Sequence, residues 1–174
     1  MMLVTLTNAQ REVRVNRAPL ARLAKRAVRR LRIRTPGTIA ITFLGRHQIQ
    51  VLNRRFLRHD RPTDVLSFRY NNVQGSGFGV RGNGPQPSTL NPEPIVGEIF
   101  IAPALARAYA RRHGLSYDDE LARYVVHGLL HWLGHDDATP TQRRKMRALE
   151  DALLSKRSQG NKVTRSHARS QVTL

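Results

Sequence analysis

The sequence predicts a single domain in which helices and a few strands share one core. Its 174 residues can bury one sizeable core but leave little room for a second domain. Hydrophobic residues make up 40% of the chain and charged residues 24%, values that suit a globular protein. Segments with the 3.6-residue period of helices alternate with short apolar runs typical of strands. One compact domain with tails is therefore expected.

The first expected element is an amphipathic helix over residues 19–32. Leu20, Leu23, Ala27 and Leu31 recur at helical spacing, and arginines and a lysine occupy the other face. No acidic residue lies on that outer face to pair with them. Phosphate binding is therefore as strong an interpretation of this face as simple solvation.

The remaining elements follow from apolar runs and their boundaries. Two strand-like runs cover residues 38–43 and 64–68, with a short helix at 47–56 between them. A third strand is expected at 97–102, and Pro103 suits the first turn of the helix that follows. Three further helices are expected, at residues 103–113, from near residue 117, and at about 141–155. The last of these helices begins with a cluster of basic residues.

Two segments differ from this domain of residues 1–155. Residues 71–94 contain five glycines and four prolines, which predicts a long Gly/Pro-rich surface loop inserted into the domain. Residues 156–174 carry several Lys and Arg residues, no acidic residue and no hydrophobic periodicity. We expect this tail to be a disordered basic arm.

Charge and composition narrow the classes of function. Thirty Lys and Arg against twelve Asp and Glu give a net charge of +18, so a polyanion such as nucleic acid is the expected partner. The chain has no run approaching the roughly 18 apolar residues of a membrane span, and its N-terminus lacks a signal-peptide pattern. We therefore expect a cytoplasmic protein without a membrane partner. Cysteine is absent, which leaves histidine and carboxylates for any metal site.

The residues suited to chemistry are concentrated at 124–137, YVVHGLLHWLGHDD. Apolar side chains surround the axis of this helix, which predicts that it is buried in the core. His127 and His131 are spaced i and i+4, so they lie on one face about 6 Å apart at Cβ. A pair of hydrogen-bonded core histidines is the simplest alternative for such spacing alone.

The residues after the second histidine favour a metal site. Gly134 can adopt the left-handed conformation that ends a helix and reverses the chain. His135, Asp136 and Asp137 follow, and each can ligate a metal. Two imidazoles and one returning group would form a three-ligand zinc site with an open position, as in catalytic zinc centres. The similar spacing of metzincin peptidases includes a glutamate base where this chain has Gly128, so a peptidase is disfavoured.

Three motifs taken together resemble the YbeY family. They are HGLLHWLGHDD at residues 127–137, PTDVLSF at 62–68 and GEIFI at 97–101. The resemblance covers roughly residues 52–154. It implies a single α+β domain with a small mixed sheet packed with helices and the metal-binding helix in the core. It also implies one zinc ion and a metal-dependent endoribonuclease, a hydrolase of RNA phosphodiester bonds, in ribosomal RNA maturation and ribosome quality control.

Site residues follow from this resemblance. The third ligand, ten positions after His127, is typically histidine in the family but is Asp137 here, so the expected zinc ligands are His127, His131 and Asp137. The family's arginine after its LNxxY segment is displaced by one residue, which makes Arg58 the candidate catalytic residue.

Weaker candidates surround these positions. Arg61 is a second phosphate-binding candidate, and Thr63 and Ser67 could position substrate or only bond the backbone. Asp64 could brace the site, and Glu98 is a candidate partner of a ligand histidine.

Two functions are compatible with the sequence. The first is a single-strand-specific, zinc-dependent endoribonuclease that acts on ribosomal RNA. The alternative is a non-catalytic RNA-binding ribosome-assembly factor whose zinc is structural. A fourth protein ligand would indicate a structural zinc, whereas three ligands and an open position would indicate catalysis. The sequence does not indicate the oligomeric state.

Overall fold

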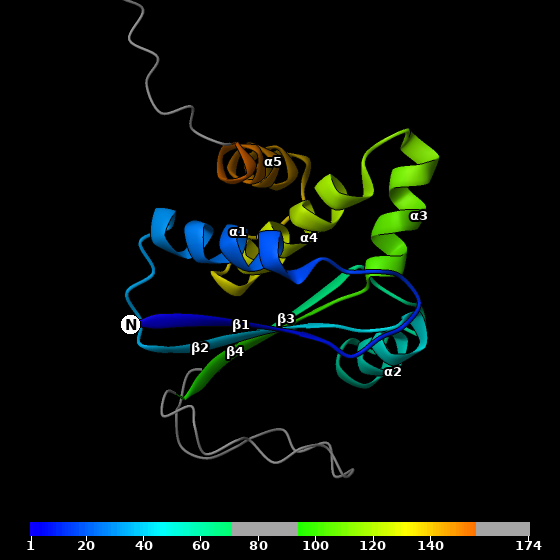
Figure 1. Ribbon diagram of the computed structural model, residues 1–174, viewed down its shortest axis with the longest axis horizontal. Helices are drawn as coiled ribbons and strands as arrows, with labels where there is room; N and C mark the ends of the chain where they lie inside the picture. Colours follow the sequence, from blue (N-terminus) through cyan, green and yellow to red (C-terminus); the bar gives the residue numbers. More distant parts are fainter. Residues whose placement is uncertain (71–93, 156–174) are drawn as a thin grey trace, which may run out of the picture.

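The computed structural model describes residues 1–70 and 94–155. In these ranges four strands form one mixed sheet and five helices pack around it, which confirms the expected α+β fold (Figure 1). The elements follow in the order β1 (Met2–Asn8), α1 (Arg17–Arg30), β2 (Gly37–Phe43), α2 (Arg46–Leu57), β3 (Val65–Arg69), β4 (Ile95–Ile101), α3 (Pro103–His113), α4 (Tyr117–Trp132) and α5 (Pro140–Leu154).

The strands lie in the order β1-β2-β4-β3. β1 and β4 both run parallel to β2, whereas β3 is an edge strand that pairs antiparallel with β4. Parallel neighbours need a crossover connection, and α1 supplies it between β1 and β2. In the β3–β4 register Ser67 lies opposite Ile99, so these two residues share one face of the sheet.

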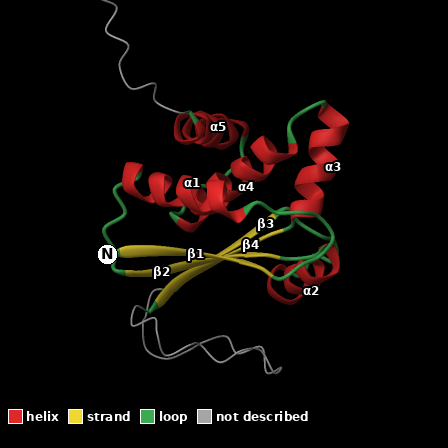
Figure 2. Cartoon of the chain, in the orientation of Figure 1, coloured by secondary structure: helices red, strands yellow, loops and turns green. Residues whose placement is uncertain are grey.

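The helices form layers on the two faces of the sheet. α1 and α4 lie against one face, α5 lies on the far side of them from the sheet, and α2 lies against the opposite face (Figure 2). The main core fills the space between the sheet and α1 and α4, and Val125, Val126, Leu129 and Leu130 of α4 are fully buried there. This confirms that the histidine-bearing helix lies in the core.

The sequence-based expectations need correction at one place. β1 was not expected, although its alternation of Val4 and Leu6 with Thr5 and Thr7 is the period-two signal of a strand. The helix expected from near residue 117 is confirmed as α4, which continues to Trp132 and carries both histidines.

Two predicted segments lie outside the described residues. The basic tail at 156–174 lies outside entirely, and the Gly/Pro-rich loop at about 71–94 lies outside except for its last residue.

Among the helices of the described ranges, none has the length and apolar character needed to cross a bilayer.

Two glycines allow α4 to approach the sheet closely. A Cβ atom at Gly128 would lie 2.5 Å from Ile99 Cγ2 of β4 and 3.1 Å from Val65 Cγ1 of β3. At Gly97 of β4 a Cβ atom would lie 1.9 Å from Trp132 Nε1. Neither site has room for a side chain, so both glycines set the distance between α4 and the sheet.

The first prediction concerns Gly128. Gly128→Ala should lower the free energy of unfolding by roughly 1–3 kcal/mol, because the added methyl group forces α4 and β4 apart. Chemical denaturation of the purified variant measures this change. If the cost arises from contact with Ile99, the double variant with Ile99→Ala should lose less than the sum of the two single changes. Strict additivity would contradict this explanation.

Candidate metal centre and adjoining groove

His127 and His131 lie one turn apart on α4, and their Nε2 atoms are 2.9 Å apart. Ser116 caps the N-terminus of α4, because its side chain accepts a hydrogen bond from the backbone N–H of Asp119 at 3.3 Å. Asp118, Asp119 and Glu120 lie in its first turn, where their negative charges interact favourably with the positive end of the helix dipole. These features stabilise the N-terminal end of the helix that carries the two histidines.

The chain reverses after α4 through a Schellman motif. Gly134 has φ +94°, its N–H donates to the carbonyl of His131 at 2.9 Å, and the N–H of His135 donates to Leu130 at 3.0 Å. The reversal returns the carboxylate of Asp137 to the histidines. Its oxygens lie 4.0 Å from Nε2 of His127 and 3.9 Å from Nε2 of His131.

α5 holds the returning segment in place. Arg143 donates from Nη1 to the carbonyl oxygens of Asp137 at 3.1 Å and Ala138 at 2.8 Å. Thr139 caps α5, and Gln142 completes a capping box. Asp137 is thus positioned by the end of α4 and by the beginning of α5.

The second nitrogen of each histidine already has a partner. Nδ1 of His127 lies 2.8 Å from Oε1 of Glu150, and Nδ1 of His131 lies 2.9 Å from the backbone oxygen of His135. Both oxygens only accept hydrogen bonds, so each Nδ1 is the donor. In the neutral imidazoles each Nε2 therefore presents a lone pair, which is the form that ligates metals.

This donor set fits a metal ion. Two lone pairs facing each other at 2.9 Å repel unless a cation lies between them. One donor atom each from His127, His131 and Asp137 lies within 4.8 Å of the others. Tetrahedral zinc with bonds of 2.0–2.1 Å would place its ligand atoms about 3.3 Å apart, between the shorter and longer separations here. Within the described ranges no fourth ligating side chain joins the group, which leaves one side open.

Glu150 connects His127 to a third charged group. Its carboxylate is 4% exposed and also accepts from Arg123 Nη1 at 2.9 Å. Burial opposes ionisation of Glu150, but its hydrogen bonds to His127 and Arg123 outweigh burial and lower its pKa. Burial lowers the pKa of His127, but the hydrogen bond and charge of Glu150 outweigh it, so the net pKa is raised. The pKa of His131 is lowered by burial and by His127.

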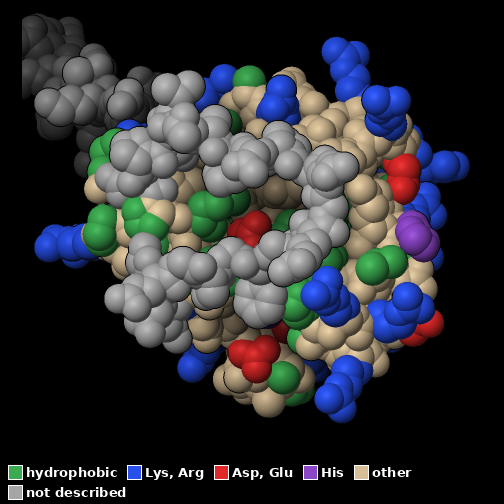
Figure 3. Space-filling model, turned by 90° about the horizontal axis from the view of Figure 1, so that it is seen from below, with side chains coloured by type: hydrophobic (Ala, Val, Ile, Leu, Met, Phe, Trp, Pro, Cys, Tyr) green, Lys and Arg blue, Asp and Glu red, His purple; other side chains and the backbone are tan. Residues whose placement is uncertain are grey.

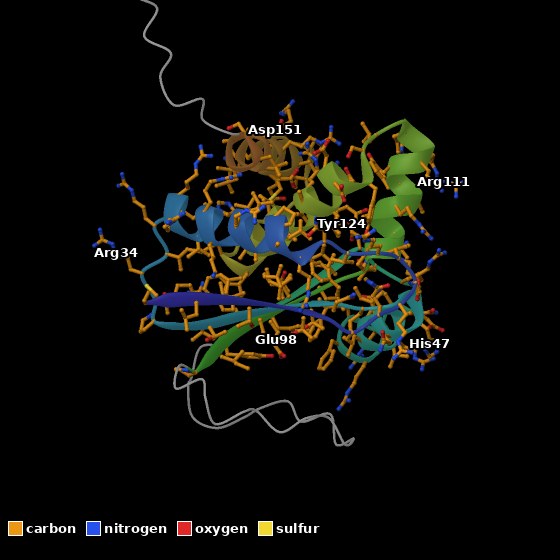
Figure 4. All side chains as sticks on the ribbon, viewed as in Figure 1. Arg34, His47, Glu98, Arg111, Tyr124 and Asp151 are labelled. Atoms are coloured by element: carbon orange, nitrogen blue, oxygen red, sulfur yellow. The ribbon has the colours of Figure 1, made fainter. Side chains whose placement is uncertain are left out.

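The sequence-based reasoning missed Glu150 and assigned its role to Glu98. Glu98 instead accepts a hydrogen bond from the Tyr70 hydroxyl, and Figure 4 shows it pointing away from α4 on the other side of the sheet. The available signal was an acidic residue on the apolar stripe of α5, between Met146 and Leu153. A carboxylate on a buried face needs a partner, and that partner is the ligand-type histidine of α4.

A pocket of about 220 Å³ adjoins the three-residue group, and a second pocket of about 440 Å³ continues from it. The first is lined by side chains of α3, α4 and α5 together with Asp64 and Asp137. The second is lined by side chains of α2, α3 and the segment before β3 together with Tyr124 of α4. They share the lining residues Asp64, Tyr109 and Tyr124, so together they form one groove. The arginines that line the first pocket are Arg123, Arg143 and Arg147, and those that line the second are Arg61 and Arg112.

The other sequence-based candidates lie around this groove. Ser67 donates to the backbone oxygen of Gly128 at 2.9 Å, so its hydroxyl ties β3 to α4. Thr63 donates to Asp64 at 3.1 Å, and both line the second pocket. Arg58 ends α2 in a left-handed conformation with φ 58° and is exposed. Neither of the two pockets has Arg58 in its lining.

Comparison with known proteins agrees with this geometry. The sequence model described as Endoribonuclease YbeY matches residues 5–158 of the chain. The chain belongs to the YbeY family. A YbeY endoribonuclease of Acidothermus cellulolyticus is 34% identical over 146 residues, covering 82% of this chain and 84% of the relative. Another from Thermobifida fusca is 32% identical over 136 residues, covering 78% and 82%.

The fold is also found in a solved structure. The solution structure of TM1509 from Thermotoga maritima matches with a TM-score of 0.52, covering 87% of this chain and 89% of that chain. The two sequences are 20% identical, so this match supports the fold. The resemblance to YbeY proteins inferred from three sequence motifs is confirmed by the family model and by the two endoribonuclease relatives.

The second prediction tests the third ligand. Asp137→Ala should lose most bound zinc, because it removes the oxygen donor that faces both Nε2 atoms. His135→Ala should keep zinc, since His135 meets His131 through its backbone oxygen. Asp137→His should bind zinc at least as well as the parent. Elemental analysis of the purified proteins measures zinc content, and an empty His135→Ala beside a loaded Asp137→Ala would contradict the assignment.

The third prediction concerns Glu150. Glu150→Gln should weaken zinc binding roughly 10- to 100-fold at pH 8, because a neutral amide is a poorer partner for the ligand imidazole. The difference should shrink at pH 6. The raised pKa of wild-type His127 leaves more of it protonated there, and protonated histidine does not bind metal.

Competition with a zinc-binding dye at both pH values measures these affinities. Asp151→Asn is the matched control, since Asp151 is an exposed carboxylate of α5 that also bonds Arg123. An equal loss in the two variants would show that Glu150 acts only through Arg123.

Proposed function

We propose that this YbeY-family chain is a single-strand-specific endoribonuclease that uses one zinc ion and acts on ribosomal RNA in the cytoplasm. Its role would be ribosomal RNA processing and the maturation and quality control of ribosome subunits. The observation that carries the proposal is the three-residue group beside an arginine-lined groove, whose first pocket is lined by His127 and Asp137. The relatives named above are endoribonucleases, which supports the same reaction.

His127, His131 and Asp137 would hold the zinc ion through two Nε2 atoms and a carboxylate oxygen. When bound, zinc supplies Lewis-acid stabilisation of a phosphoryl oxygen and lowers the pKa of water towards about 7. Glu150 keeps the proton of His127 on Nδ1, so that Nε2 remains available. Asp137 adds a negative charge that three imidazoles would lack, so activity should reach its plateau at higher pH than with a third histidine.

The groove supplies the charges that RNA requires. Arg147 and Arg143 line the pocket beside His127 and can hold the phosphates on either side of the scissile bond. Burial, followed by the charges of Asp64 and Glu120, raises the pKa of Tyr124. Its hydroxyl therefore remains protonated and can donate to a phosphate oxygen.

Substrate shape follows from the pocket beside the metal group. At about 220 Å³ it has room for a phosphodiester group and its adjoining atoms but not for both strands of a duplex. In an A-form duplex the strand is held against its partner, whereas single-stranded loops and ends can be splayed onto a protein. This supports the preference for single strands.

Unpaired basic side chains support RNA as the partner. On α1, Arg22, Lys25 and Arg29 are exposed, and none forms an ion pair with another residue of the described ranges. Figure 3 shows Lys and Arg side chains along the margin of the opposite face, on the side where α2 lies. Such surfaces bind phosphates without sequence preference.

The fourth prediction tests the reaction itself. Zinc-loaded protein should cleave a fluorescent single-stranded oligoribonucleotide and leave the same strand in a duplex largely intact. His131→Ala should abolish cleavage and lose zinc while keeping the helical circular dichroism spectrum, because the apolar surface of α4 is unchanged. His135→Ala, one turn away, is the matched control and should remain active.

Each alternative result has a clear meaning. Full metal-dependent cleavage by His131→Ala would contradict the assigned site. A folded zinc-loaded protein that binds RNA but cleaves none, together with unfolding of His131→Ala, would favour the ribosome-assembly factor with a structural zinc. Structural zinc sites normally have four protein ligands, and the group here has three within the described residues.

The fifth prediction concerns Arg58, the candidate catalytic residue inferred from the resemblance to the YbeY family. If its guanidinium reaches the scissile phosphate, Arg58→Ala should lower kcat at least 10-fold with little change in KM. Arg61→Ala should mainly raise KM, because Arg61 lines the groove away from the histidines. Cleavage by Arg58→Ala at the wild-type rate would remove this residue from the mechanism.

A further inference from the structure

Two of the residues that line the second pocket of the groove are exposed, large hydrophobic side chains. Leu57 at the end of α2 is 53% exposed, and Tyr109 on α3 is 40% exposed. Both belong to the small set of large hydrophobic side chains that are exposed in the described ranges. Their presence in one pocket indicates a site for a flat apolar group.

Tyr109 is well placed to present its ring. Its centroid lies 4.2 Å from that of His113, one turn further along α3, with 36° between the ring planes. Tyr109 also lines the pocket beside His127, so its ring stands where the two pockets join. Among the Phe, Tyr and Trp residues of the described ranges, Tyr109 is the one with an exposed ring. A nucleobase is the flat partner that such a ring binds in a nucleic-acid groove.

Polar groups of the pocket complement a nucleotide. Arg61 and Arg112 line it, and neither forms an ion pair with a described residue. Asn53, at 2% exposure, donates from Nδ2 to the Arg61 backbone oxygen at 2.7 Å and so holds the segment that carries Arg61. Two free guanidinium groups suit the phosphates of a bound strand.

We propose that this pocket is a nucleobase subsite. The base of a nucleotide next to the reacting phosphodiester stacks on Tyr109 beside Leu57, and Arg61 and Arg112 hold its neighbouring phosphates. The adjacency follows from Tyr124, which lines both pockets and lies one turn before His127 on α4. The inference rests on the proposed function in placing an RNA strand at the metal group.

Binding measurements test the subsite without relying on cleavage. Fluorescence anisotropy would measure the affinity of the zinc-loaded full chain for a short single-stranded RNA with cleavage-resistant phosphorothioate linkages. In a series of such strands one base at a time is replaced by an abasic site. Wild type should show one position where loss of the base weakens binding roughly 5- to 150-fold.

Tyr109→Leu should weaken binding of the intact strand by a similar factor and show no further loss at that position. Tyr109→Phe keeps the ring and should behave like wild type. Both variants should fold, because the side chain is exposed, and circular dichroism checks this. Equal abasic profiles in wild type and Tyr109→Leu would overturn the inference.

Two adjacent arginines on α3 provide a matched pair for the phosphate contact. Arg112→Ala should weaken binding of every strand and reduce the slope of log affinity against log salt by about one. Arg111→Ala removes the same charge but should have little effect, since Figure 4 shows Arg111 pointing outward from α3. Equal salt slopes in these two variants would overturn the assigned role of Arg112.

The outcomes separate the subsite from the proposed reaction. Cleavage of RNA without a Tyr109-dependent position would overturn the subsite and leave the endoribonuclease proposal standing. A Tyr109-dependent position without cleavage of any RNA would support the subsite and contradict the endoribonuclease. Absence of binding to any strand would overturn both.

Discussion

The close contact between α4 and the sheet at Gly128 is the constraint on which the site depends. With no side chain at this position, the helix backbone approaches Ile99 and Val65 directly. Residue 127 then faces away from the sheet towards α5, where Glu150 meets it. The same contact explains why a glutamate base next to the first histidine has no place in this fold. Position 128 faces the sheet and has no room for one.

The three-residue metal group depends on three local structural features and one tertiary contact. Helical spacing aligns the two histidines, the Schellman turn at Gly134 reverses the chain, and the capped start of α5 holds Asp137. Each of these features depends on a few neighbouring residues, which is why sequence patterns can predict it. The contact with Glu150 is different, because it joins residues 23 positions apart on two helices.

A buried carboxylate at Glu150 has electrostatic consequences for the whole centre. It is stabilised in its charged form by Arg123 and His127, and it raises the pKa of His127 in the metal-free chain. It also fixes the tautomer that leaves Nε2 free. Together with Asp137 it places negative charge beside an otherwise strongly basic groove, which favours a cation there and phosphates around it.

The sequence by itself determined most of the elements and the two facing histidines, because periodicity and turn signals act over one or two helical turns. The turn after Gly134 left His135, Asp136 and Asp137 open as the third ligand, and the resemblance to the YbeY family selected Asp137. It missed β1, whose short alternating run is a weak signal, and it assigned the role of Glu150 to Glu98. Tertiary structure alone decided which carboxylate meets His127 and which arginines line the groove. These choices depend on how α5 and α3 pack against α4, and no local pattern records the packing of distant segments.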